Sequence, residues 1–154
     1  MDKAQIFERY YNLSLRYLSY RPRSEKEIVD YLTRKKIDEQ IQHKIIEKLK
    51  TYNFINDLEF AKFRVEQRVK FKHKPLRAIE FELKQKGIDR DLIDGAMAKF
   101  EDKNVFDLEN AKKLAEKKLD FYRNLDGKKR KEKVMSYLLR KGFSYDTVKK
   151  VLDY

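Results

Sequence analysis

One helical pattern recurs three times along the chain, at intervals of about fifty residues. In each copy an aliphatic residue is followed four positions later by leucine, and five positions after that by isoleucine or phenylalanine. The three copies are Ile28–Leu32–Ile37, Ile79–Leu83–Ile88 and Val134–Leu138–Phe143. A recurrence at this period indicates a tandem array of small modules, because each copy is one supersecondary unit that buries its apolar face against its neighbours.

The spacing within each copy predicts a helix, a tight turn and a second helix. A spacing of four residues places two apolar side chains on one helix face. Gly87 and Gly142 stand just before the isoleucine or phenylalanine, where a residue with positive φ would end the helix. Asp38, Asp89 and Ser144 then occupy the N-cap position of the next helix.

The first copy departs from this pattern, because Lys36 stands where the other two copies have glycine. If the turn has the same geometry in all three copies, positive φ at Lys36 costs on the order of 1–2 kcal/mol. The alternative is a first turn of a different shape.

A longer amphipathic segment precedes each helix pair. Apolar residues step by three or four positions in three segments, residues 6–17, 58–69 and 108–122. Ser24 and Glu27 form a capping box at the start of the following helix in the first copy, and Pro75 suits the first turn of the equivalent helix. We therefore predict an all-α fold, an elongated array of three tandem three-helix repeats with about nine helices. The predicted repeats are residues 2–52, 56–102 and 104–154.

A three-helix unit of about fifty residues buries little apolar surface by itself. We therefore expect neighbouring repeats to share a core. The residues expected in that core are Ile6, Leu13, Ile28, Leu32, Ile45, Leu49, Leu58, Val65, Ile79, Leu83, Leu92, Leu108, Leu138 and Leu152.

Positive charge is concentrated in three clusters. The 154 residues include 38 Lys and Arg against 26 Asp and Glu, a formal net charge of +12. Seven basic residues fall within each of three segments, residues 16–36, 62–77 and 128–141. Each cluster lies near the entry to the second helix of its repeat, so stacked repeats should join the clusters into one basic stripe. Such a stripe favours a polyanionic partner, with binding that weakens as the salt concentration rises.

Aromatic side chains lie among these basic residues, at Tyr20, Phe63, Phe71, Tyr137 and Tyr145. Exposed aromatics among cations are typical of sites that bind single-stranded nucleic acid, because bases stack on them. Helical spacing nevertheless favours a core or interface position for most of these five residues.

Several classes of chemistry lack the residues that they need. The chain contains no Cys, and neither of its two histidines, His43 and His73, has a second potential ligand close in sequence. No glycine-rich phosphate loop is present. We therefore expect no metal ion, no cofactor and no catalytic residue, and hence no enzyme activity.

The same composition bears on location. No apolar run approaches the roughly 20 residues of a membrane span. A chain without Cys also fits a reducing compartment. We expect a cytoplasmic protein that does not enter the membrane, and we expect it to be a monomer.

Four short motifs, in order along the chain, resemble those of the RecX family. The segment RPRSEKEI at residues 21–28 resembles the family's N-terminal motif. The segments NDLEFA at 56–61 and KGI at 86–88 resemble its central motifs, and RKGFS at 140–144 is similar to its C-terminal motif. Lys36 departs from the family pattern, which usually has glycine there.

This resemblance implies a regulatory protein that binds the RecA recombinase filament on DNA and inhibits its ATPase and strand-exchange activities. It implies tandem three-helix repeats and no catalytic residues. The implied partners are the RecA filament and single- or double-stranded DNA, the latter bound weakly and in a salt-dependent manner. The candidate binding residues are Arg21, Arg23, Arg34, Lys35, Lys70, Lys72, Lys74, Arg77, Lys84, Lys86, Lys128, Arg130, Lys131, Arg140 and Lys141.

The residues alone leave two other functions open. The first is a DNA-binding regulator with helix-turn-helix-like repeats, either sequence-independent or operator-type. Acidic residues at the starts of the third helices, at Asp38, Asp89 and Asp146, disfavour operator reading, since a recognition helix presents Arg, Asn or Gln to the bases there. The second is a helical scaffold for another acidic protein.

Overall fold

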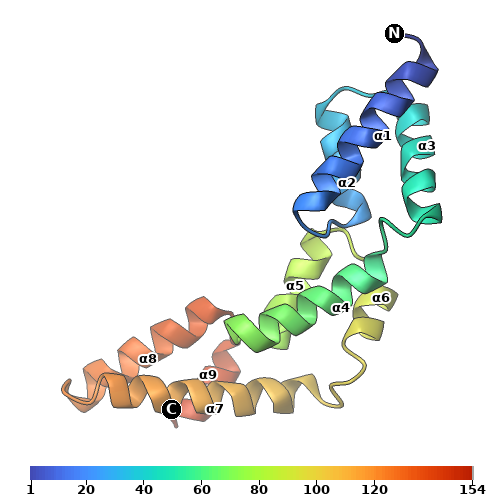
Figure 1. The fold of residues 1–154 in the computed structure, drawn as a ribbon. Helices are drawn as coiled ribbons and strands as arrows, with labels where there is room; N and C mark the ends of the chain where they lie inside the picture. The colour runs from blue at the N-terminus through green and yellow to red at the C-terminus, as the bar shows by residue number, and fades with distance from the viewer. Residues whose placement is uncertain (154) are drawn as a thin grey trace. The chain divides into compact units, whose positions relative to one another are not determined.

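The computed structural model describes residues 1–153, and within that range the chain is helical between short turns and loops (Figure 1). The helices are α1 (Lys3–Tyr20), α2 (Glu25–Arg34), α3 (Glu39–Thr51), α4 (Asp57–Gln67), the π-helix η1 (Arg68–Lys72), α5 (Leu76–Gln85), α6 (Arg90–Ala96), α7 (Lys103–Phe121), α8 (Gly127–Lys141) and α9 (Tyr145–Leu152). The predicted all-α tandem array of three-helix repeats is confirmed. Tyr154, which closes the third predicted repeat, lies outside the described residues.

The chain forms two compact units, which we describe separately. Unit 1 contains residues 1–63 and 83–96, and unit 2 contains residues 64–82 and the chain from residue 97 onward. In unit 1, α1, α2 and α3 pack around a cluster that includes Ile28, Leu32, Ile45 and Leu49. In unit 2, α7, α8 and α9 pack around a cluster that includes Ala111, Leu138, Val148 and Leu152.

The three helix–turn–helix copies share one turn geometry. Lys36, Gly87 and Gly142 all have positive φ, at 59°, 78° and 106°. In each copy the next residue donates its backbone N–H to the leucine carbonyl five positions earlier, from Ile37 to Leu32 at 3.2 Å, from Ile88 to Leu83 at 3.1 Å and from Phe143 to Leu138 at 3.2 Å. The first turn therefore has the same shape as the other two, although a lysine occupies the glycine position.

Replacing Lys36 with glycine is expected to raise the free energy of unfolding by about 1 kcal/mol. Relief of the left-handed conformation exceeds the added chain entropy of glycine. Lys35 is the matched control, because its φ of −81° is one that any residue adopts. Lys35→Gly should lower stability by roughly 0.5–1 kcal/mol. Urea unfolding of both variants checks the sign, and a destabilised Lys36→Gly variant would contradict the account.

An aspartate from the following repeat caps the second helix of the preceding one. In unit 1, Glu25 donates its backbone N–H to Asp57 Oδ1 at 2.9 Å. In unit 2, Leu76 and Arg77 donate theirs to the two carboxylate oxygens of Asp107, at 2.7 and 3.3 Å. Because a helix N-terminus leaves backbone donors without partners, these contacts stabilise the helix start and fix the junction between repeats.

The buried Asp107 makes stability depend on pH. Burial raises the pKa of its carboxyl above the usual 3.8, and the hydrogen bonds from Leu76 and Arg77 offset only part of that rise. A carboxyl with a raised folded-state pKa contributes stability that is complete below its unfolded pKa and is lost as the pH rises through the folded pKa. Relative to Asp107→Asn, the wild type should therefore gain stability as the pH falls from 7 toward 3.8. A stability difference that is constant with pH in urea titrations would contradict this expectation.

The predicted core is mostly buried. The buried members are Ile28, Leu32, Ile45, Leu49, Val65, Ile79, Leu83, Leu138 and Leu152. Ile6 is partly buried and packs against the cluster of α1, α2 and α3. The prediction was wrong for Leu13, Leu58, Leu92 and Leu108, which are only partly buried. A three-helix unit is too small to cover both flanks of every apolar stripe, so side chains at the edge of a stripe keep some contact with solvent.

Candidate nucleic-acid interface

Three candidate cations of unit 1 surround one carboxylate. Arg21 and Arg23 lie 2.8 and 3.9 Å from Glu27 Oε2, and Lys86 Nζ lies 3.2 Å from Glu27 Oε1. The Arg23 guanidinium also stacks 3.8 Å from the centre of the Tyr17 ring, and its side chain is only 12% exposed. These contacts brace the loop between α1 and α2. Arg23 is therefore poorly accessible to a partner.

Other candidate cations of unit 1 lie on the surface. Arg34 ends α2, Lys35 follows it, and Lys84 lies on α5. All three side chains are exposed. The unit 1 candidates therefore divide into cations that hold the fold together around Glu27 and cations that face solvent.

Unit 2 has a similar cluster around Glu82 of α5. Arg64 and Arg68 approach Glu82 Oε1 at 2.8 and 3.0 Å, and Lys74 lies 3.7 Å from Oε2. Burial alone would raise the pKa of Glu82, but the hydrogen bond from Arg68 and the charges of Arg68, Arg64 and Lys74 outweigh it and hold the pKa below its usual value. Glu82 therefore stays ionised at neutral pH, and Lys74 has a structural partner.

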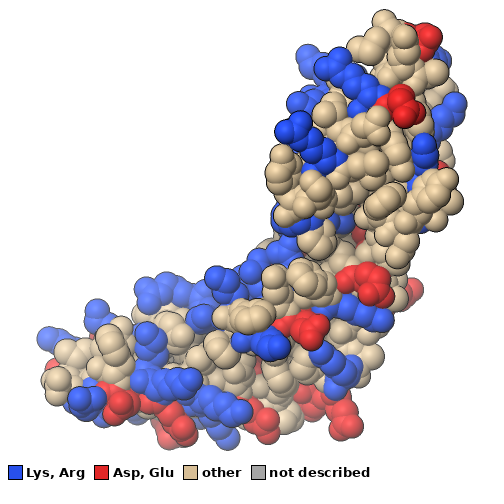
Figure 2. Space-filling view, viewed as in Figure 1, with Lys and Arg blue, Asp and Glu red and all other residues tan. Residues whose placement is uncertain are grey.

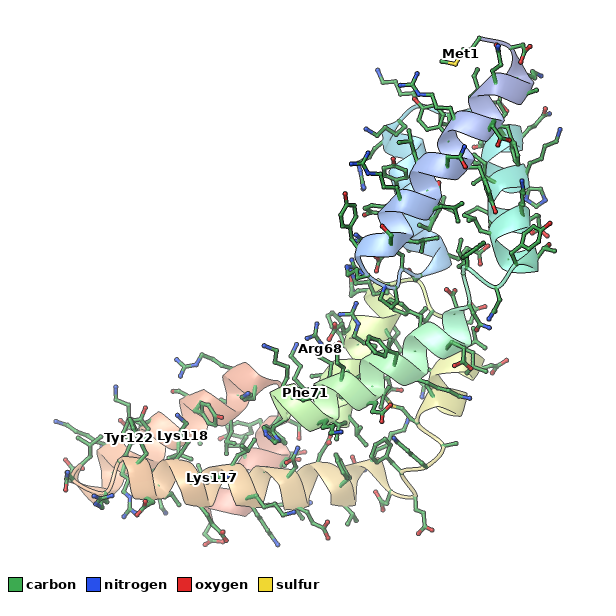
Figure 3. All side chains as sticks on the ribbon, in the orientation of Figure 1. Met1, Arg68, Phe71, Lys117, Lys118 and Tyr122 are labelled. Carbon is green, nitrogen blue, oxygen red and sulfur yellow. The ribbon has the colours of Figure 1, made fainter. Side chains whose placement is uncertain are left out.

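Between Arg68 and Lys74 the chain forms η1, the π-helix that follows α4 (Figure 3). His73 ends it in a left-handed conformation with φ of 51°, and the Lys74 N–H returns to the Arg68 carbonyl at 3.2 Å. The exposed residues of this turn include Lys70, Lys72 and Phe71, which is 68% exposed. π-helices are rare in proteins, but those that occur are often found at functional sites. This turn is therefore a candidate contact surface.

The second and third basic clusters meet at this turn. Lys141, the last residue of α8, donates from Nζ to the backbone carbonyl of Lys72 at 2.8 Å. Arg77 begins the exposed face of α5 a few residues further along. We call Lys70, Lys72, Arg77, Arg140 and Lys141 the unit 2 basic surface.

The start of α8 carries further positive charge, and Figure 2 shows Lys and Arg side chains gathered along this helix. Its first turn contains no acid. Cations at a helix N-terminus are unfavourable by about 0.3–1 kcal/mol each, so helix stability does not explain Lys128 and Lys131, which are both exposed. Arg130 differs, because its Nε donates to the Leu119 carbonyl at 2.7 Å and so caps the end of α7.

Comparison with known proteins identifies the family. Models of the first, second and third three-helix domains of RecX match residues 11–49, 56–97 and 106–152. A regulatory protein RecX of Finegoldia magna is 32% identical over 146 residues, which cover 94% of this chain and 71% of that protein. The chain belongs to the RecX family. Each of the three matches falls within one predicted repeat, in the same order.

Several curated RecX proteins are longer than this chain. A regulatory protein RecX of Bacillus pumilus is 40% identical over 137 residues, which are 89% of this chain but 51% of that protein. The chain thus spans about half the length of several curated relatives that it matches. Among solved structures, RecX from Lactobacillus salivarius has a TM-score of 0.77 and 31% identity, over 97% of this chain and 96% of that one. The relatives from Bacillus pumilus and Finegoldia magna are named as regulatory proteins.

The RecX repeats expose more aromatic rings than their helical spacing predicted. We expected most of Tyr20, Phe63, Phe71, Tyr137 and Tyr145 to be core or interface residues, and this was wrong for four of them. Tyr20 is 70% exposed, Phe63 47%, Phe71 68% and Tyr145 56%. These four rings therefore lie mostly outside the core.

Within residues 1–153, no group of His, Cys, Asp and Glu side chains could hold a metal ion. Over the same residues, none of the helices combines the length and hydropathy that a membrane span requires. A candidate site of this RecX chain is the unit 2 basic surface, beside which the ring of Phe71 is exposed.

Proposed function

We propose that this RecX chain binds the RecA–DNA filament and inhibits the ATPase and strand-exchange activities of the recombinase. The observation that carries the proposal is the unit 2 basic surface, where Lys141 of α8 contacts the Lys72 carbonyl in η1. Two clusters far apart in the sequence thereby present their cations together. A surface of this kind matches the phosphates of filament-bound DNA and acidic patches on the recombinase.

Contacts by exposed lysines and arginines are individually weak, because solvent and salt screen them. Several such contacts on a repeating partner act together, since the first contact raises the effective concentration of the others. We therefore propose that the filament is bound more tightly than free RecA or bare DNA, by a RecX monomer that needs no cofactor and works in the cytoplasm. The exposed cations of unit 1, Arg34, Lys35 and Lys84, would add further contacts.

We also propose that the functional modules are the three repeats, residues 2–52, 56–102 and 104–154. Their equivalent turns and the equivalent Asp57 and Asp107 caps support this division. On this view each repeat contributes one group of cations to binding.

An ATPase titration tests the proposed function. RecA from the same host is assembled on single-stranded DNA with ATP, and the chain is added at increasing ratios to RecA. We expect ATP hydrolysis to fall at substoichiometric doses, because one regulator would act on a multi-protomer filament. Excess DNA serves as the control for simple competition for the strand. Unchanged hydrolysis at stoichiometric doses would contradict the proposal, and tight binding to one duplex sequence without RecA would favour a transcriptional role.

A further inference from the structure

The short segment from Arg68 to Lys74 is fastened at both ends to the same side chain. Arg68 hydrogen-bonds to Glu82 through Nε at 3.2 Å and Nη2 at 3.0 Å. Lys74 reaches the other oxygen of Glu82 at 3.7 Å. The middle of the segment is held from a third direction, by the hydrogen bond from Lys141 to the Lys72 carbonyl. The backbone of η1 is therefore preorganised, and the side chains between these anchors are the part left available to a partner.

Phe71 is the central side chain of this fastened segment. Its ring is 68% exposed, although an aromatic ring in water contributes nothing to the hydrophobic core. Lys70 and Lys72 flank it, and both are exposed. The Lys70 ammonium lies 5.8 Å from the ring centre. Among residues 62–77 Glu66 is the one acid against seven basic residues, and Glu82 of α5 is paired with three of those basic residues. Positive charge therefore predominates in this part of the chain.

We propose that Phe71 is a stacking platform for a base of single-stranded nucleic acid, with Lys70 and Lys72 holding the adjacent phosphates. An exposed ring between cations suits this ligand, because every base offers a flat face and every nucleotide a phosphate. Preorganisation of η1 lowers the ordering cost of binding. The inference rests on the proposed function, since it assigns the strand of the RecA–DNA filament, or an adjoining single strand, to this surface.

Phe81 provides a matched control in the same unit. Its ring is 64% exposed, close to the value for Phe71, but it stands between Glu80 and Glu82 on α5. Glu80 is paired with Lys103 at 3.6 Å, and Glu82 is paired with its three cations. Phe81 therefore has no cation at either adjacent position to hold a phosphate, whereas Phe71 has a lysine at both, so we assign no base to Phe81. Both rings are exposed, and their replacement should leave the fold unchanged, which circular dichroism checks.

The test uses fluorescence, because the chain contains no tryptophan. Phe71→Trp and Phe81→Trp each introduce a single reporter. Titration with oligo(dT) should quench the tryptophan at position 71 and leave the one at position 81 unchanged, with quenching reversed by salt. In fluorescence anisotropy, Phe71→Ala should weaken oligo(dT) binding by roughly 5- to 150-fold, and Phe81→Ala by less than about 2-fold.

The outcomes separate this inference from the proposed function. No quenching at position 71, or equal loss of binding in both alanine variants, overturns the inference even if the wild type still inhibits RecA. Oligo(dT) binding that persists in Phe71→Ala while binding to the filament is lost would assign the ring to the recombinase instead, and would also overturn it. Quenching at position 71, together with no inhibition of RecA by the wild type, would support base stacking on Phe71 and contradict the proposed function.

Discussion

Replacing Lys70, Lys72 and Arg140 with glutamate is expected to remove most of the affinity for single-stranded DNA and for the RecA–DNA filament. Each exposed cation that contacts a phosphate releases a counterion on binding. The loss of one such cation should make the negative slope of log affinity against log salt concentration shallower by about 0.7. Lys74 is left out, because reversal there would place a second carboxylate beside Glu82, which now lies 3.7 Å from the Lys74 ammonium. Anisotropy at several salt concentrations measures the affinity and the slope together.

The matched control reverses Lys112, Lys113 and Lys117 of α7, which are also exposed. The change in net charge is identical, three reversals from the same +12. These lysines share their helix face with the exposed acids Glu109 and Glu116, so they do not form a uniformly basic surface. The control should retain most of the binding. Equal losses in the two triple variants would mean that overall charge, and not the unit 2 basic surface, determines affinity.

Leu138→Ala is expected to have the largest effect on stability, lowering the free energy of unfolding by about 2–5 kcal/mol. Leu138 is completely buried in the cluster of α7, α8 and α9, so truncation loses hydrophobic burial and leaves a cavity. The adjacent Leu139 is 40% exposed, and Leu139→Ala should cost under about 1 kcal/mol. Urea unfolding of the two variants measures both values. Similar losses would show that the repeat does not place its leucines as described.

The repeat itself was predictable from the sequence because it rests on local rules. A spacing of four and five residues places Leu32, Leu83 and Leu138 at equivalent buried positions, and all three are completely buried. The same rule held at Lys36, where the hydrogen bonds of the turn enforce positive φ despite the lysine. At position 36 the geometry of the repeat therefore outweighs the preference of lysine for negative φ.

The division of the basic residues into structural and exposed ones was not predictable. Arg23, Lys74 and Lys86 look like their neighbours in the sequence, yet each lies against Glu27 or Glu82. These ion pairs depend on which helices approach one another, and spacing along the chain does not encode that. Counting basic residues along the sequence therefore could not predict the ion-pair clusters around Glu27 and Glu82.

The π-helix η1 was missed for a related reason. Val65 and Val69 continue the apolar steps of the preceding helix, which predicted a regular helix through that segment. In the structure α4 ends at Gln67, and the wider turn of η1 begins at Arg68. The Glu82 and Lys141 contacts hold that turn, and both come from residues distant in the sequence. Pro75 shortly after the turn is the one local signal of a helix end.

The most direct test of the account compares binding to three targets at near-physiological ionic strength, about 0.15 M. RecA–DNA filaments are held stable with a slowly hydrolysed ATP analogue, and binding of the chain is measured by co-sedimentation beside free RecA and bare single-stranded DNA. We expect tight binding to the filament, weaker binding to either component, and loss of the filament interaction in the variant reversed at Lys70, Lys72 and Arg140. Equal affinity for bare DNA and filament, or undiminished filament binding by that variant, would contradict it.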